Sequence, residues 1–165
     1  MNKTELQQKI VDIEKQLAEL KKELDKKDKG IWKPDRGKTY YYIASDGIVY
    51  EDVNKNFERG LDEDRFGFGN YYKTEKEAQK MANYLKYTNL LRKYVEEHSE
   101  PINWKNDEPK YSIWYDTDRN IFHAEGDDCY RQQGTIYASS EEVLKDAISF
   151  LGEENIKRYI FFIEE

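Results

Sequence analysis

Cysteine, histidine and long hydrophobic runs are scarce in this sequence of 165 residues. A single cysteine, Cys129, excludes a disulfide bond within the chain and fits a reducing compartment, so we interpret it as structural or incidental. The two histidines, His98 and His123, lack the partners that a histidine and cysteine metal site requires. The most apolar run, residues 159–163, is far too short to span a bilayer, and the polar N-terminus shows no signal peptide. We therefore expect a cytoplasmic protein with no membrane partner, metal or cofactor.

Positive charge is also in deficit, since 34 Asp and Glu residues outnumber 27 Lys and Arg residues and leave a net charge of -7. This balance opposes binding along a nucleic-acid backbone and suits a protein that docks on a basic surface. No catalytic Ser-His-Asp or Cys-His order and no Gly-rich phosphate loop is present, so the sequence predicts no enzyme and no catalytic residue. Aromatic residues, by contrast, are plentiful, with 14 Tyr, 7 Phe and 3 Trp. Disordered chains are poor in them, so we expect a folded core built partly from aromatic side chains.

Residues 1–29 carry the pattern of a coiled-coil helix. Their apolar side chains recur at alternating steps of four and three residues, which is the a/d spacing of a heptad repeat, and the residues between them favour helix. The six predicted seam positions are Leu6, Ile10, Ile13, Leu17, Leu20 and Leu24. The pattern predicts a homo-oligomer assembled through this helix. The alternative is a helix that folds back onto its own domain.

After a turn-rich linker, residues 30–38, the sequence predicts an α+β domain over residues 39–165 that contains an internal repeat. Residues 69–94 align without gaps with residues 134–159, at a constant offset of 65. Identical residues coincide at Gly69/Gly134, Tyr72/Tyr137, Glu77/Glu142, Lys80/Lys145, Ala82/Ala147 and Tyr94/Tyr159. We expect two similar half-units, residues 39–97 and 110–164, that share one core.

Each half-unit is predicted to hold a β-hairpin, a further strand and a capped helix. The first has strands over 39–44 and 48–51 around an Asp-Gly turn, a solvated loop over 52–65 and a strand over 66–72. A helix then begins with the capping box Thr74 and Glu77; it ends at about Lys86 or continues to Glu97, with or without a break near residues 88–89. The second has strands over 111–115, 121–124 and 135–138, a helix to Gly152 capped by Ser139 and Glu142, another helical turn, and a last strand over 159–163. The pattern indicates a mainly antiparallel sheet with helices on one face.

Two groups of residues between positions 62 and 71 are candidates for binding a ligand or partner. The aromatic group resembles the octapeptide of RNA-recognition motifs, in which rings on a strand stack on bases; it comprises Phe66, Phe68 and Tyr71. The basic residue and glycine that open that octapeptide are absent here, and a core strand is the alternative. The acidic group comprises Asp62, Glu63 and Asp64, for which the alternative is a solvated loop.

Three motifs resemble a recurrent set of small bacteriophage and prophage proteins of Firmicutes. They are Trp32-Lys33-Pro34 followed by Tyr40-Tyr41-Tyr42-Ile43, the segment 73–78, and the Gly-Glu-Glu segment that begins at Gly152. Proteins of that set also begin with a short coiled coil and end on a Gly-Glu-Glu helix. The resemblance covers nearly the whole chain and implies a phage origin. Its motifs are structural, so it implies no functional residues.

The acidic balance and the lack of catalytic motifs favour a binding protein. Small, acidic, oligomerising phage proteins are often antagonists of host systems, so by analogy we expect a phage-encoded protein that neutralises a bacterial defence component in the cytoplasm of the infected host. It would cover a basic surface of a nuclease or other effector, or hold a nucleotide-like signal in aromatic pockets between subunits. The alternatives are a nucleic-acid-binding accessory protein of phage replication or recombination, and a structural role through the coiled coil.

Overall fold

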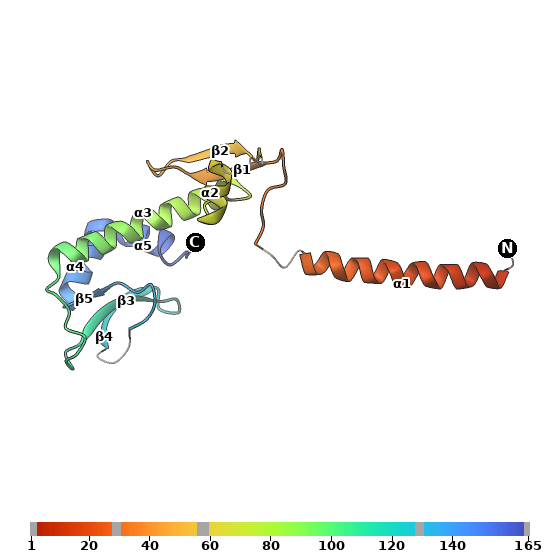
Figure 1. Cartoon of the computed structure of the whole chain (residues 1–165). Coiled ribbons are helices and arrows are strands. Elements are labelled where there is room, and N and C mark those ends of the chain that lie inside the picture. The colour runs from red at the N-terminus through yellow and green to blue at the C-terminus, as the bar shows by residue number, and fades with distance from the viewer. Residues whose placement is uncertain (1–2, 28–30, 56–59, 128–130, 164–165) are drawn as a thin grey trace.

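The computed structural model describes residues 3–27, 31–55, 60–127 and 131–163 (Figure 1). Cys129 and Gly30 therefore lie outside the described residues. The described chain forms α1 (Lys3–Lys27), β1 (Thr39–Ile43), β2 (Val49–Val53), α2 (Leu61–Gly67), α3 (Glu75–His98), β3 (Lys110–Asp116), β4 (Ile121–Asp127), β5 (Tyr137–Ala138), α4 (Glu141–Leu151) and α5 (Glu153–Tyr159). All strand pairs are antiparallel, so the predicted α+β class with an N-terminal helix is confirmed.

The strands form two small open sheets instead of one continuous sheet. β1 pairs with β2 around the turn at Asp46 and Gly47, where the Asp46 carboxylate accepts a hydrogen bond of 3.0 Å from the Ile48 amide and Gly47 has a φ of 80°. The second sheet has the order β4-β3-β5. Its hairpin turns at Asn120, whose φ of 58° is a conformation that Asn adopts more readily than most residues. Both predicted hairpins are therefore confirmed.

The two half-units have the same strand connectivity. In the second unit, the first hairpin strand also pairs with the residues that precede the helix, where Ser112 of β3 lies opposite Tyr137 of β5. In the first unit, Tyr41 of β1 forms an antiparallel bridge with Tyr72, and the two residues exchange backbone hydrogen bonds of 3.0 and 2.8 Å. Tyr72 and Tyr137 are equivalent at the offset of 65. Gly69 and Gly134 are also equivalent, with φ angles of 71° and 81°.

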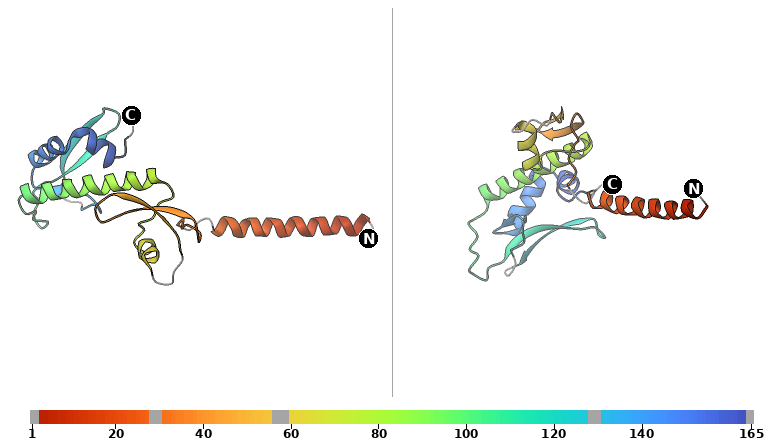
Figure 2. Two further views of the ribbon diagram at one scale, coloured as in Figure 1. Left: turned by 90° about the horizontal axis from the view of Figure 1, so that it is seen from above. Right: turned by 45° about the vertical axis from the view of Figure 1, so that its right-hand side comes forward.

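The long helix α3 connects the two half-units (Figures 1 and 2). Thr74 begins it with the predicted capping box, because its side chain accepts from the Glu77 amide while the Glu77 carboxylate accepts from the Thr74 amide. Its first turns pack against β1 and β2, where Ala78 and Ala82 are buried. Its last turns place Leu91 and Val95 in the main core.

The main core belongs to the second half-unit and the end of α3. Its buried members are Leu91, Val95, Ala138, Leu144, Ala147, Leu151 and Ile156. Within the described residues, Tyr40, Tyr71, Ala78 and Ala82 of the first half-unit are buried outside this cluster, whereas Leu91 and Val95 of the same half-unit belong to it. The main core therefore draws on both half-units, while the hairpin end of the first half-unit also has buried residues of its own. Between these two ends of α3, Leu85 is 43% exposed.

The predicted loop over 52–65 and strand over 66–72 are wrong in their main features. β2 extends to Val53, and α2 occupies Leu61–Gly67, so only the bridge at Tyr72 remains of the strand. The first turn of α2 is acidic and Arg65 lies in its last turn. This arrangement of charge complements the helix dipole.

Two predictions about the second half-unit are also wrong. Residues 159–163 form no strand, because α5 continues to Tyr159 and the chain then turns, with Ile160 and Phe161 packed against the main core. The cap of α4 is Ser140, whose side chain accepts from the Val143 amide, and not Ser139. Ser139 is engaged elsewhere, since its amide donates to the Ser99 hydroxyl over 2.8 Å.

We expect Thr74→Ala to lower the free energy of unfolding by about 1 kcal/mol, because it removes the hydroxyl that caps the helix on which both halves depend. Urea denaturation followed by circular dichroism measures this change. Thr74→Ser keeps the hydroxyl and serves as the control. Equal stability of the alanine variant and the native protein would contradict the structural importance of this cap.

Candidate binding surfaces

The structure separates the predicted acidic group into one buried and two exposed residues. Asp62 is 9% exposed and accepts hydrogen bonds from the Tyr40 hydroxyl, at 2.5 Å, and from the Lys55 amide, at 3.0 Å. Glu63 and Asp64 are exposed. Burial of Tyr40, together with the hydrogen bond to Asp62, raises the pKa of its hydroxyl to about 12. Asp62 is thus part of the interior, and only Glu63 and Asp64 can meet a partner.

Arg65 joins α2 to the first hairpin. Its guanidinium donates to the Tyr40 hydroxyl over 2.7 Å and to the Asp52 carboxylate over 2.6 Å, and lies 3.4 Å from the centre of the Tyr42 ring. The hydrogen bond from Arg65 holds the pKa of Asp52 below its ordinary value. The sequence alone gave no indication of these partners, which lie 13 and 25 positions away along the chain. The only local signal was the run of three acidic residues before Arg65, which favours a helix.

The predicted aromatic group does not form a row of stacking faces. Phe66 is half-buried, with its ring centre 5.5 Å from that of Tyr40 and 4.9 Å from that of Tyr71. Tyr71 is only 8% exposed, whereas Phe68 is 91% exposed at the end of α2. Because these residues belong to a helix end and a turn, the arrangement seen in RNA-recognition motifs is absent here.

The exposed residues of α2 and the chain after it form what we call the acidic-aromatic surface: Leu61, Glu63, Asp64 and Phe68. Phe68 also lines a hollow of about 540 Å³. The aromatic and aliphatic side chains that line this hollow are Ile31, Trp32, Phe66, Phe68 and Tyr71. Lys73 and Glu77 line it as well, so a hollow that is mainly aromatic lies next to the exposed ring at the end of α2.

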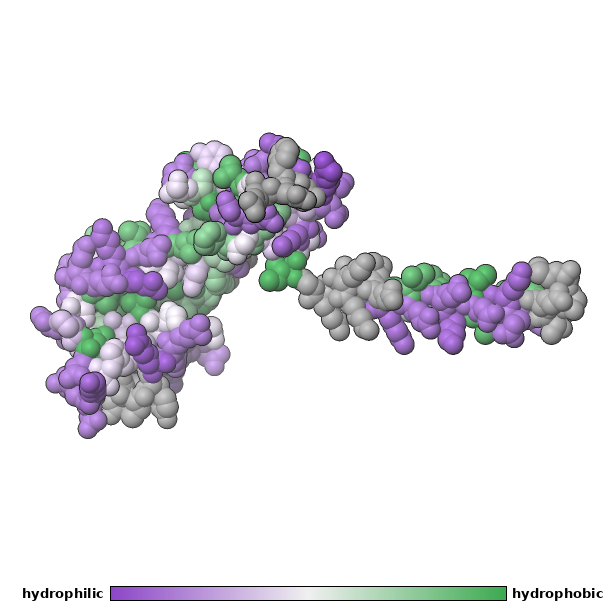
Figure 3. All heavy atoms as spheres, in the orientation of Figure 1, coloured by the Kyte–Doolittle hydropathy of each residue, from purple (hydrophilic) through white to green (hydrophobic). Residues whose placement is uncertain are grey.

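A second candidate surface is α1, which extends away from the rest of the chain (Figures 1 and 2). Every side chain described on it, from residue 6 to residue 22, is exposed. The seam positions among them are between 46% and 62% exposed: Leu6, Ile10, Ile13, Leu17 and Leu20. The side chain of Leu24 lies outside the described part. Hydrophobic atoms gather mainly along one edge of α1 in Figure 3. This row of exposed apolar side chains, the stripe of α1, is a surface against which a partner could pack.

Comparison of the chain with protein-family models, curated proteins and solved structures finds no match in any of the three. None of the helices in the described part of the chain combines the length and the apolar composition needed to cross a membrane. Within the same part, no three His, Cys, Asp or Glu side chains gather closely enough to hold a metal ion. The chemistry of the exposed surfaces therefore has to support any assignment of function.

Asp52 makes the stability dependent on pH. Its pKa is lower in the folded chain than in the unfolded one, so its contribution is present above the unfolded value of about 4 and is lost as the pH falls through the folded value. We expect Asp52→Asn to cost about 1–2 kcal/mol at pH 7, and the difference from the native protein to shrink below about pH 4. Urea titrations across this range measure it. Asp118→Asn, which removes the same charge from an exposed turn, corrects for net charge, and a difference that stays constant with pH would contradict the ion pair.

The predicted assembly through α1 can be tested at one seam residue. In the predicted coiled coil, Leu17→Asp would bury an unpaired carboxylate at the interface, which would cost about 3 kcal/mol or more of association free energy. We expect light scattering to give a multiple of the chain mass of 19.8 kDa for the native protein and a single chain for the variant. Ala18→Asp puts the same charge beside the seam and should leave the mass unchanged. A native protein that is already a monomer would contradict the assembly.

Proposed function

We propose that this chain is a phage-encoded, non-enzymatic protein that binds and antagonises a protein component of a bacterial defence system in the cytoplasm of the infected host. The observation that carries the proposal is the acidic-aromatic surface, where Phe68 is 91% exposed one helical turn after the exposed Asp64, whose carbonyl oxygen accepts a hydrogen bond from the Phe68 amide. A phenylalanine ring exposed to this extent gains free energy when a partner buries it. Exposed aromatic side chains of this kind are frequent centres of protein interfaces.

Charge favours a basic partner. The chain carries a net charge of -7, and the carboxylates of Glu63 and Asp64 lie in the first turn of α2. Complementary charge accelerates association and selects partners, while the buried ring supplies affinity. The nucleic-acid-binding face of a nuclease or other effector is the kind of basic surface that would accept this combination.

The surface is held in a defined shape before it binds. Asp62 and Arg65, on the inner side of α2, form hydrogen bonds to Tyr40 and Asp52 of the hairpin. A short helix held in this way loses little conformational freedom on binding. The buried residues of the segment thus support the exposed ones.

Self-association through α1 would present several copies of the surface at once. When two copies engage neighbouring sites, the second binding step is intramolecular, so avidity exceeds the affinity of one copy. This arrangement suits an antagonist that acts on an oligomeric effector. The resemblance to phage proteins supports the proposed origin.

The proposal is tested by capture of the tagged, full-length protein from a lysate of the bacterial host, with quantitative mass spectrometry of the retained proteins. We expect one basic defence protein in stoichiometric amount. Phe68→Ala and the double variant Glu63→Lys with Asp64→Lys should each reduce its capture by about tenfold or more, because each removes a central contact.

The matched control is Phe150→Ala, because Phe150 is also strongly exposed, at 70%, but lies on α4. It should retain full capture, and circular dichroism should show that all variants are folded. Equal capture by the native protein and both surface variants would contradict the assignment of this surface. Salt-dependent retention of single-stranded nucleic acid, in place of a protein, would favour the accessory role in phage replication or recombination.

A further inference from the structure

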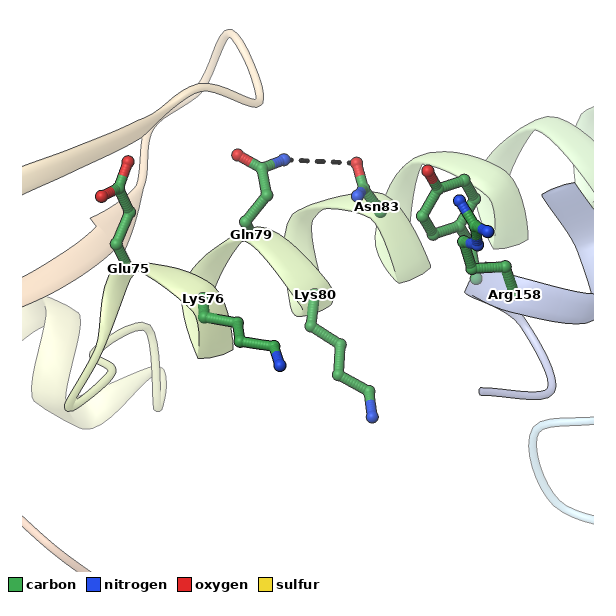
Figure 4. A pocket seen from close by; sticks show the side chains of 7 residues that line it. Glu75, Lys76, Gln79, Lys80, Asn83 and Arg158 are labelled. Atoms are coloured by element: carbon green, nitrogen blue, oxygen red, sulfur yellow. Dashed lines mark hydrogen bonds between the residues drawn. The ribbon is translucent and has the colours of Figure 1, made fainter. Parts of the chain in front are cut away.

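A second hollow, of about 630 Å³, lies along α3 beside α5 (Figure 4). We call it the α3–α5 groove. Its lining residues are Glu75, Lys76, Gln79, Lys80, Asn83, Arg158 and Tyr159. None of them belongs to the acidic-aromatic surface. The volume falls in the range of about 300–1,000 Å³ that is usual for small-molecule sites.

The groove is positively charged although the protein is acidic. Lys76, Lys80 and Arg158 are exposed, and Glu75 is the only carboxylate among the lining residues. Among the residues that the structure describes, no carboxylate forms an ion pair with any of these three cations. Their charges are therefore available to an anionic ligand.

The internal repeat provides a direct comparison for Lys80. Its counterpart at the offset of 65 is Lys145, which forms an ion pair of 2.6 Å with Glu141, one helical turn earlier. The residue equivalent to Glu141 in the first half-unit is Lys76. A salt bridge in one half-unit thus corresponds to two neighbouring lysines in the other.

The same comparison applies to Arg158. Its counterpart is Lys93, which lies 3.9 Å from the Glu97 carboxylate one turn later. The residue equivalent to Glu97 is Phe162. Each of these carboxylates therefore has a different kind of residue at its equivalent position: Lys76, which lines the groove, replaces one, and the Phe162 ring replaces the other.

Phe162 places an aromatic ring next to Lys80, one of the residues that line the groove. Its ring centre lies 4.5 Å from the Lys80 ammonium group and 5.3 Å from the centre of the Tyr84 ring, on which it stacks. Phe162 has a φ of 55°, a conformation that favours glycine and is unusual for a bulky residue. The chain turns back there, and the Ile163 amide donates to the Lys157 carbonyl oxygen over 3.1 Å. The turn at the end of α5 thus holds the Phe162 ring beside the ammonium group of Lys80.

We infer that the α3–α5 groove binds a small organic phosphate that carries an aromatic ring, of the nucleotide class. Lys76, Lys80 and Arg158 would hold the phosphate through charge-assisted hydrogen bonds. The Tyr159 side chain, which lines the groove and stacks on Tyr87 with ring centres 4.8 Å apart, provides an apolar surface for the base, and the Phe162 ring beside Lys80 would extend it.

Amide side chains of α3 that line the other edge of the groove supply directional contacts. The Gln79 amide nitrogen donates to the Asn83 amide oxygen over 3.2 Å, and Figure 4 shows this pair on one edge of the groove, with the two lysines on the other. Amide groups can donate to and accept from base and sugar atoms. A long nucleic acid fits poorly, because it would extend beyond three cations onto a chain of net charge -7. The groove is formed within one chain, and its ligand is independent of the proposed protein partner.

Isothermal titration calorimetry of the full-length protein at low salt tests the inference. The probes are AMP, GMP and UMP, with adenosine, inorganic phosphate and a single-stranded oligonucleotide for comparison. We expect at least one nucleotide to bind once per chain, and adenosine and phosphate to bind about tenfold more weakly or worse, because each lacks half of the contacts.

The repeat supplies matched controls. Lys80→Gln and Arg158→Gln should each weaken nucleotide binding about tenfold or more, whereas Lys145→Gln and Lys93→Gln, at the equivalent positions, should leave it unchanged. Phe162→Leu should weaken nucleotide binding but not phosphate binding. The inference is overturned if no nucleotide binds at millimolar concentration, if the control variants weaken binding equally, or if the oligonucleotide binds more tightly than every mononucleotide.

Discussion

Burial along α3 is the constraint on which the rest of the structure depends. The two-stranded hairpin of the first half-unit would be marginal alone, and it gains its buried surface from Ala78 and Ala82 on the first turns of this helix. The second half-unit completes its core with Leu91 and Val95 from the last turns. A helix of 24 residues spans about 36 Å, which is long enough for the two half-units to pack at its two ends. The α3–α5 groove lies on its first turns, where exposed side chains flank the buried Ala78 and Ala82.

Features set by neighbours in the sequence could be predicted, and features set by distant contacts could not. The stripe of α1, the Asp46-Gly47 turn and the cap at Thr74 depend on residues within one or two turns, and each appears in the structure. Residues 66–72 have the composition of a strand, but Asp62 and Arg65 find partners on β1 and β2 that favour a helix instead. Of the candidate site residues, the structure therefore leaves Glu63, Asp64 and Phe68 exposed, and the sequence did not indicate the groove because its two walls are far apart along the chain.

The internal repeat explains how one backbone arrangement presents two different surfaces. Tyr72 and Tyr137 pair with equivalent strands, and Gly69 and Gly134 make equivalent turns, so these positions maintain the fold. Exposed helix positions are free to differ, since surface ion pairs contribute little to stability. The loss of a carboxylate next to Lys80 or Arg158 therefore costs the fold little, while it changes what the surface can bind.

Net charge distinguishes ligands by their size. Charges in water act over about 8–10 Å at physiological ionic strength, so a small phosphate in the groove responds mainly to Lys76, Lys80 and Arg158. A polymer extends well beyond that distance and also meets the acidic remainder of a chain with a net charge of -7. The same overall charge that opposes binding of a nucleic-acid backbone therefore leaves the local positive charge of the groove available to a small anion. It also leaves Glu63 and Asp64, on a different element, to attract a basic protein, so that one acidic chain can present two surfaces of opposite preference.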